Sequence, residues 1–308
     1  MSLQLALAIS AVVLANVGAL RLGNTQHIRR LSTSLRAATN TEREDSYTIA
    51  ILGDLHLDPR YMEDHIMGRE HFKKVILDET GNPKPNTVCV SLGDLGESKS
   101  VDPERTKELF AGTSACLQLA RDYLDGYKVP FEVVGGNHDL EGLDEFATDQ
   151  QNLDAYLSIL GKPTPQFKRL IAEKTMLVGL GSTVFREARY TSHEVFIDDE
   201  QVAWFEQTIK ECPADEGWRV FVFSHAPPMG SGLRVLQENH VINGCCWLNH
   251  SGRNTGKFIE IVRSNPCIKA WFSGHFHLGQ VPLIAMLCRR ACIVFTAPLA
   301  FLMSPHFT

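Results

Sequence analysis

Five short apolar runs in this chain each lead into a turn that carries side chains able to bind a metal ion. The runs are Tyr47–Leu52, Thr87–Leu92, Pro130–Val134, Arg219–Phe223 and Ile268–Phe272. The turns after them contain, in the same order, Asp54 and His56; Asp94 and Glu97; Asn137, His138 and Asp139; His225; and His275 and His277. Apolar runs of this length bounded by glycine-containing turns predict strands. Because strand ends converge at one edge of an α/β sheet, we expect these side chains to lie together.

The rest of the chain predicts a layered α/β domain around these strands. A sixth apolar run, Met176–Leu180, indicates a further strand, and helices are expected at Asp64–Leu77, Pro103–Leu124 and Asp199–Glu211. Alternating strands and helices are typical of α/β architecture. The sequence contains no internal repeat and no Pro/Gly-rich linker, so we expect a single domain over residues 46–280.

Each turn alone is a weak signal. An Asp-x-His pair is common, and a lone His after a strand is more often a structural residue with a hydrogen bond. Five such turns in order, each with nitrogen or oxygen ligands and none with a competing Lys, are hard to explain by chance. Together they indicate a metal site.

The ordered turns resemble the pattern of the calcineurin-like metallophosphoesterase superfamily, which is DxH, GDxxD, GNH[D/E], an isolated His and GHxH. The resemblance covers residues 47–280. It implies a four-layer α/β/β/α sandwich of two mixed β-sheets flanked by helices. It also implies a hydrolase with a dinuclear metal centre that cleaves a phosphomonoester, a phosphodiester or a nucleotide.

The resemblance assigns two sets of metal ligands that share Asp94. The first set is Asp54, His56, Asp94 and His277, and the second is Asp94, Asn137, His225 and His275. A carboxylate has two oxygens, so Asp94 can bridge ions about 3.5–4 Å apart. Imidazole, carboxylate and amide ligands without a thiolate suit Mn, Fe or Zn.

The same resemblance implies that a metal-activated hydroxide attacks phosphorus while His138 protonates the leaving oxygen. Asp139 or Glu97 is then expected to orient the His138 ring. Glu97 departs from the family pattern, which has Asp at the last position of GDxxD. Arg60 and Arg69 follow the first turn and could bind substrate phosphate, although two solvated arginines are the simpler interpretation.

Two alternatives to a small-molecule phosphoesterase stay open. One is a non-catalytic protein-interaction scaffold on the same fold, but such proteins usually lose metal ligands. The other is a protein Ser/Thr phosphatase, which carries Arg-Gly after GDxxD and a GNHE turn, where this chain has Ser98-Lys99 and GNHD. We therefore expect a small phosphorylated substrate.

The charge distribution argues against a nucleic-acid substrate. No Asp or Glu precedes Glu42, and four arginines lie before it. Without those four, 26 basic residues face 36 acidic ones, a net charge of −10. Sequence-independent binding to a polyanion requires clustered Lys and Arg.

Residues 1–45 are expected to be a presequence outside the fold. Leu3–Leu20 is nearly all apolar, as in a signal peptide, and Arg21–Thr41 is rich in Arg, Ser and Thr and free of acid, as in a transit peptide. This combination predicts a plastid reached through the secretory route; the alternative is secretion or an endomembrane lumen. Residues 139–146 and 179–196 also resemble a plant and cyanobacterial subgroup of the superfamily, in agreement with a plastid.

The C-terminal segment departs from the family pattern. We expect residues 281–308 to be an atypical, truncated tail with one strand, Ala291–Thr296. The apolar stretch Ala297–Met303 that follows is too short for a membrane span. No stable membrane span is expected in the mature protein.

Overall fold

The computed structural model describes residues 47–102, 109–188, 193–231, 247–276, 293–296 and 300–303. Its strands are β1 (Thr48–Leu52), β2 (Thr87–Ser91), β3 (Phe131–Val133), β4 (Phe167–Ala172), β5 (Thr175–Leu180), β6 (Arg219–Ser224), β7 (Ile268–Ser273), β8 (Ile293–Thr296) and β9 (Ala300–Met303). Its helices are α2 (Met62–Ile76), α3 (Ser114–Asp125), α4 (Asp149–Leu160), α5 (Asp199–Lys210), the 3₁₀ turn η1 (Ala214–Glu216) and α7 (Lys257–Ser264). No helix within these ranges is both long and apolar enough to cross a membrane.

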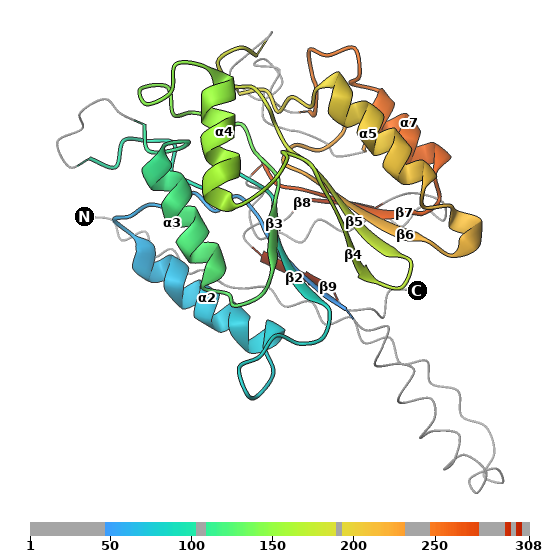
Figure 1. The fold of residues 1–308 in the computed structure, drawn as a ribbon, viewed down its shortest axis with the longest axis horizontal. Coiled ribbons are helices and arrows are strands. Elements are labelled where there is room, and N and C mark those ends of the chain that lie inside the picture. The colour runs from blue at the N-terminus through green and yellow to red at the C-terminus, as the bar shows by residue number, and fades with distance from the viewer. Residues whose placement is uncertain are drawn as a thin grey trace, which may run out of the picture.

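These strands form two mixed sheets, with the orders β3-β2-β1-β9 and β4-β5-β6-β7-β8. In the first sheet β1, β2 and β3 are parallel, and β9 is antiparallel to β1. In the second, β5 to β8 are parallel and β4 pairs antiparallel with β5. Helices α2, α3 and α4 cover the first sheet, and α5 and α7 cover the second (Figure 1). The fold is therefore the four-layer α/β/β/α sandwich that the sequence predicts.

Alternation along the central strands builds a core on each face of the first sheet. Ile49 and Ile51 of β1 belong to the core between the two sheets. Their neighbours Ala50 and Leu52 belong to the core beneath the helices. All four are buried. Strands buried on both faces have near-continuous apolar sequences, which explains why these runs could be recognised.

The helix expected at Pro103–Leu124 is wrong at its start. Residues 103–108 lie outside the described ranges, and α3 begins only at Ser114. Gly112 has φ +73°, and a Cβ there would lie 2.4 Å from the backbone nitrogen of Glu141. Thr113 then caps the helix by accepting a hydrogen bond from the Cys116 N–H. A left-handed glycine packed on another loop thus excludes helix before this point.

Two strands are absent from the sequence-based expectation. Strand β4 alternates exposed and partly buried residues and lies at a sheet edge, so its apolar signal is weak. In the tail, β8 confirms the strand expected within Ala291–Thr296, and β9 adds a second one antiparallel to β1. The presequence lies outside the described residues and stays a prediction.

Candidate metal centre

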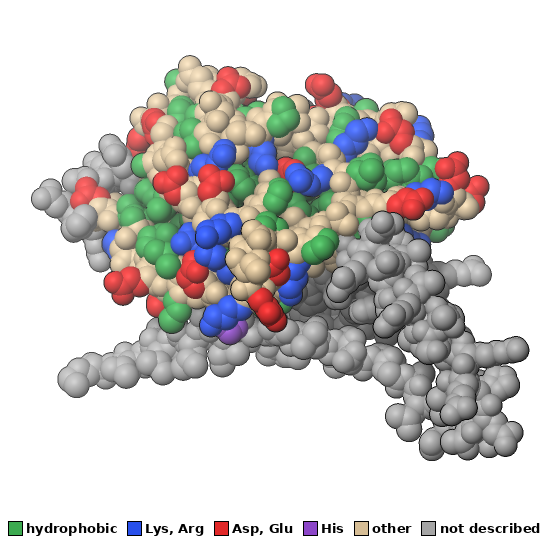
Figure 2. Space-filling model, turned by 60° about the horizontal axis from the view of Figure 1, so that its bottom comes forward, with side chains coloured by type: hydrophobic (Ala, Val, Ile, Leu, Met, Phe, Trp, Pro, Cys, Tyr) green, Lys and Arg blue, Asp and Glu red, His purple; other side chains and the backbone are tan. Residues whose placement is uncertain are grey.

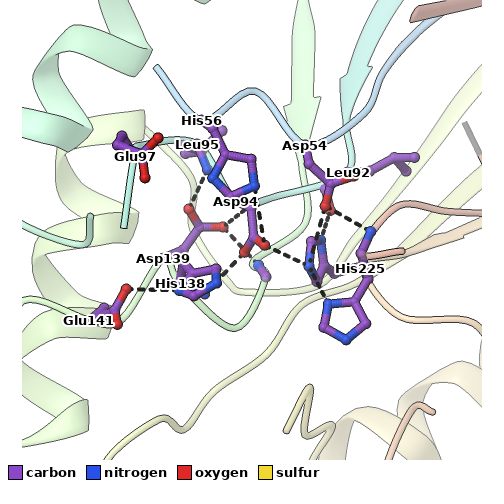
Figure 3. A network of polar contacts seen from close by, with 12 residues as sticks. Asp54, His56, Leu92, Asp94, Leu95, Glu97, His138, Asp139, Glu141 and His225 are labelled. Carbon is purple, nitrogen blue, oxygen red and sulfur yellow. Dashed lines mark hydrogen bonds and ion pairs between the residues drawn. The ribbon is translucent and has the colours of Figure 1, made fainter. Parts of the chain in front are cut away.

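The candidate ligands all follow the carboxyl ends of parallel strands, and they come from both sheets. Asp54 and His56 follow β1, Asp94 follows β2, Asn137 follows β3, His225 follows β6 and His275 follows β7. His277, the last predicted ligand, lies outside the described residues. Figure 3 shows Asp54, His56, Asp94 and His225 gathered in one polar network.

Two groups of donor atoms meet in this network and share one residue. Asp94, His225 and His275 form one group, and Asp54, His56 and Asp94 form the other; within each group the donor atoms lie within 4.8 Å of one another. From Asp94 Oδ2, the His225 Nε2 is 3.0 Å away and the His56 Nε2 is 4.0 Å away. The structure thus brings together the residues that the sequence assigns to two ions, with Asp94 between them.

Three residues of the site adopt a left-handed backbone conformation that is rare outside glycine. They are His56 (φ +42°), Asp94 (φ +48°) and His275 (φ +74°). Hydrogen bonds hold two of them: the His56 N–H donates to the Asp94 carbonyl at 2.9 Å, and the His275 N–H to Asp54 Oδ1 at 2.7 Å. Such conformations cost about 1–3 kcal/mol each and cluster at functional sites.

Gly93 allows the second turn to approach the third, which gives a test of the site's framework. Its φ is +95°, and a Cβ there would lie 2.6 Å from the Gly136 nitrogen. We expect Gly93→Ala to lower the free energy of unfolding by about 2 kcal/mol or more, measured by urea denaturation. Gly68→Ala is the control, because Gly68 lies inside α2 and a Cβ there meets nothing within 4 Å. A Gly93→Ala protein as stable as wild type would contradict the packing.

Asp139 braces two of the metal-site turns. Its carboxylate accepts hydrogen bonds from the backbone N–H groups of Asp94 (2.9 Å), Leu95 (2.8 Å) and Gly136 (2.7 Å). Burial, with the nearby Asp94 carboxylate, raises the pKa of Asp139 to about 6. The side chain therefore fixes the Asp94 turn against the turn after β3.

Glu141, rather than Asp139 or Glu97, contacts the His138 ring. His138 Nδ1 lies 2.8 Å from Glu141 Oε2. The expected orienting role of Asp139 or Glu97 is therefore wrong: Asp139 is occupied with backbone N–H groups, and the Glu97 carboxylate accepts from the Lys99 N–H at 3.2 Å.

Sequence reasoning missed Glu141 and a second neighbour of His138, His193. Glu141 lies three residues after His138 within one turn, and this spacing was a usable signal. The His193 ring lies 5.5 Å from that of His138. No motif in the sequence marked His193.

The electrostatics of the site favour positive charge beside Asp94. Burial acts to raise the pKa of Asp94, but His225, with His138 and His56, holds it well below its usual range. Burial likewise acts to lower the pKa of His225, yet the Asp94 and Asp54 carboxylates outweigh it and raise the pKa to about 10. A point that retains a proton this strongly also attracts a metal cation.

The donor set passes a test of fit for two metal ions. The Asn137 side-chain oxygen is buried and has no hydrogen-bond partner within the described part of the chain. A buried carbonyl oxygen without a partner is costly, and a cation would satisfy it. His225 Nδ1 contacts the Leu92 carbonyl at 2.7 Å, which leaves Nε2 for a metal, a common arrangement for histidine ligands.

The two arginines considered as phosphate ligands are engaged in other contacts. Arg60 Nε donates to Asp58 Oδ1 at 2.9 Å. Arg69 Nη1 donates to the Tyr123 carbonyl at 3.1 Å, and its guanidinium lies over the Tyr123 ring. Both contacts favour a structural role.

Fold and site together define an α/β sandwich with a candidate dinuclear metal centre at its strand ends. The sequence matches the family model of the calcineurin-like phosphoesterases over residues 47–279. The chain therefore belongs to the calcineurin-like phosphoesterase family. No curated protein is significantly similar to it.

Solved structures share this fold at low sequence identity. A dimetal phosphatase from Danio rerio is 14% identical with a TM-score of 0.54, over 83% of this chain and 88% of that one. A phosphopantetheinyl hydrolase from Mycobacterium tuberculosis is 13% identical with a TM-score of 0.41, over 84% of this chain and 88% of that one.

Proposed function

We propose that this protein hydrolyses phosphate esters with two metal ions. Membership of the calcineurin-like phosphoesterases supports a metal-dependent phosphoesterase. The observation that carries the dinuclear proposal is the pair of donor groups with Asp94 in common. Two ions held there would lower the pKa of bound water and neutralise charge on the phosphoryl oxygens.

In this proposal each ion has ligands from more than one strand end. Asp54, His56, Asp94 and His277 hold the first, and Asp94, Asn137, His225 and His275 hold the second. The ligand chemistry suits Mn, Fe or Zn. The presence of every ligand argues against the interaction scaffold.

His138 is the proposed general acid. It follows Asn137 directly, and its ring lies 5.9 Å from that of His56 and therefore borders the first donor group. Burial acts to lower the pKa of His138, but the hydrogen bond to Glu141 and the charge of Asp94 outweigh it and raise the pKa. A raised pKa keeps the imidazole protonated, as protonation of a leaving oxygen requires.

A small phosphorylated molecule is the proposed substrate. Beyond the N-terminal arginines the chain carries excess negative charge. On the face in Figure 2, acidic and basic side chains of the described residues are interspersed rather than separated by sign. Binding a nucleic-acid backbone needs a basic surface.

The test is hydrolysis by purified protein of phosphomonoesters, phosphodiesters and nucleotides with Mn, Fe or Zn. We expect activity toward at least one class, loss of that activity after chelation, and recovery on return of the metal. Activity that survives complete metal removal would contradict the proposal. So would the absence of hydrolysis of any substrate with any of the three metals.

A further inference from the structure

We propose that Glu141 positions His138 for proton transfer and so performs the task that the family pattern gives to the last acid of GDxxD. The inference rests on the proposed function. It concerns the one place in the motif set where this chain departs from that pattern, since Glu97 replaces the usual Asp. The inference makes Glu141 a positioning residue that acts only through the His138 ring.

The first argument is the contact itself. Glu141 Oε2 lies 2.8 Å from His138 Nδ1, a distance typical of a charge-assisted hydrogen bond. Glu141 is only 6% exposed, so little water competes for the carboxylate. A buried carboxylate that accepts the Nδ1 proton fixes the rotation of the ring and leaves Nε2 on the opposite side.

The second argument is that the backbone of Glu141 is held in place from several directions. Its N–H donates to the His138 carbonyl at 3.2 Å, which closes the turn between the two residues. Asn152 of α4 then bridges the flanking loops: its Oδ1 accepts the Gly142 N–H at 2.9 Å, and its Nδ2 donates to the Gly112 carbonyl at 2.8 Å. Because α4 anchors this turn, the carboxylate is preorganised rather than recruited by substrate.

The third argument is where the ring lies. Figure 3 shows His138 between Glu141 and Asp94, so the edge of the ring away from Glu141 is the one nearer the metal ligands. The His56 and His193 rings meet it at interplanar angles of 62° and 61°. These neighbours restrict the ring, and Glu141 selects its orientation.

Glu97 is not arranged to do this work. Figure 3 shows its carboxylate apart from the dashed network around Asp94 and His138. Its side chain accepts a hydrogen bond from the Lys99 N–H, within its own loop. The two carboxylates therefore give opposite predictions for mutagenesis.

The test compares Glu141→Ala, Glu141→Gln and Glu97→Gln, with Glu145→Gln as a matched control in the same loop. Glu145 is exposed and bonds to Ser114, away from His138. With an alkyl phosphate we expect Glu141→Ala to lower kcat about 10–100-fold with KM and metal content unchanged. Glu141→Gln, which can still accept the Nδ1 proton, should lose less. Glu97→Gln should also lose less than Glu141→Ala, and Glu145→Gln should match wild type.

A double-mutant cycle separates positioning from a general structural effect. If Glu141 acts only through His138, adding Glu141→Ala to His138→Ala should change kcat by less than about twofold, because the two residues work as a unit. An equal further loss in the double variant would overturn the proposal, and so would wild-type activity of Glu141→Ala.

Failure of the proposed function would look different. A wild-type protein that hydrolyses nothing would contradict the function, but the pairing would still be tested by NMR of the imidazole nitrogens. An Nδ1–H signal of His138 that disappears in Glu141→Ala supports the positioning contact. The absence of that signal from the wild-type protein would overturn it.

Discussion

Asp94→Asn should abolish hydrolysis and release at least one metal ion. Asp94 is the residue common to both donor groups, and its carboxylate is 1% exposed. Asparagine keeps the size of the side chain but removes the negative charge and one acceptor oxygen, so the amide cannot bridge two cations. The measurement is kcat together with metal content per chain.

The matched control is Asp58→Asn. Asp58 is also a buried aspartate, but it pairs with Arg60 and belongs to neither donor group. That variant should retain both metals and most of the activity. If Asp94→Asn also keeps two metals and substantial turnover, while circular dichroism shows both variants folded, the assignment of the bridge is wrong.

The second large effect is expected for His138→Ala, and its size should depend on the leaving group. Removal of a general acid should slow hydrolysis of alkyl phosphates by about 10²–10⁴-fold. Nitrophenyl esters should lose much less, because their leaving group departs without a proton. Metal content should stay at the wild-type level, since His138 is placed next to the ligand Asn137 rather than among the donors.

An exposed histidine on α2, His71, supplies the control for this substitution. His71→Ala should leave both substrate types unaffected. If His138→Ala instead lowers metal content and slows both substrate types equally, His138 is a ligand and not the acid.

The strand ends could be predicted because their physical signal is local. A strand buried on both faces needs a continuous apolar run, and the glycines and metal ligands after it are read directly from the sequence. Thus β1, expected at Tyr47–Leu52, is observed at Thr48–Leu52. Asp54, His56, Asp94, His225 and His275 converge as expected because they follow such strands.

The features that escaped prediction depend on contacts between distant segments. The start of α3 is set by Gly112 against the backbone of Glu141, and β9 is defined by its pairing with β1. The partner of His138 was misassigned because the family pattern pointed to Glu97, and only the three-dimensional turn brings Glu141 to the ring.

The central claim, a dinuclear site, is tested most directly by the metal content of the purified chain after incubation with Mn, Fe or Zn and removal of free ions. Two donor groups that share Asp94 predict two transition-metal ions per chain. Two bound ions together with hydrolysis would support the account. A content near zero for every metal would contradict it and favour a protein that keeps the fold as an interaction scaffold.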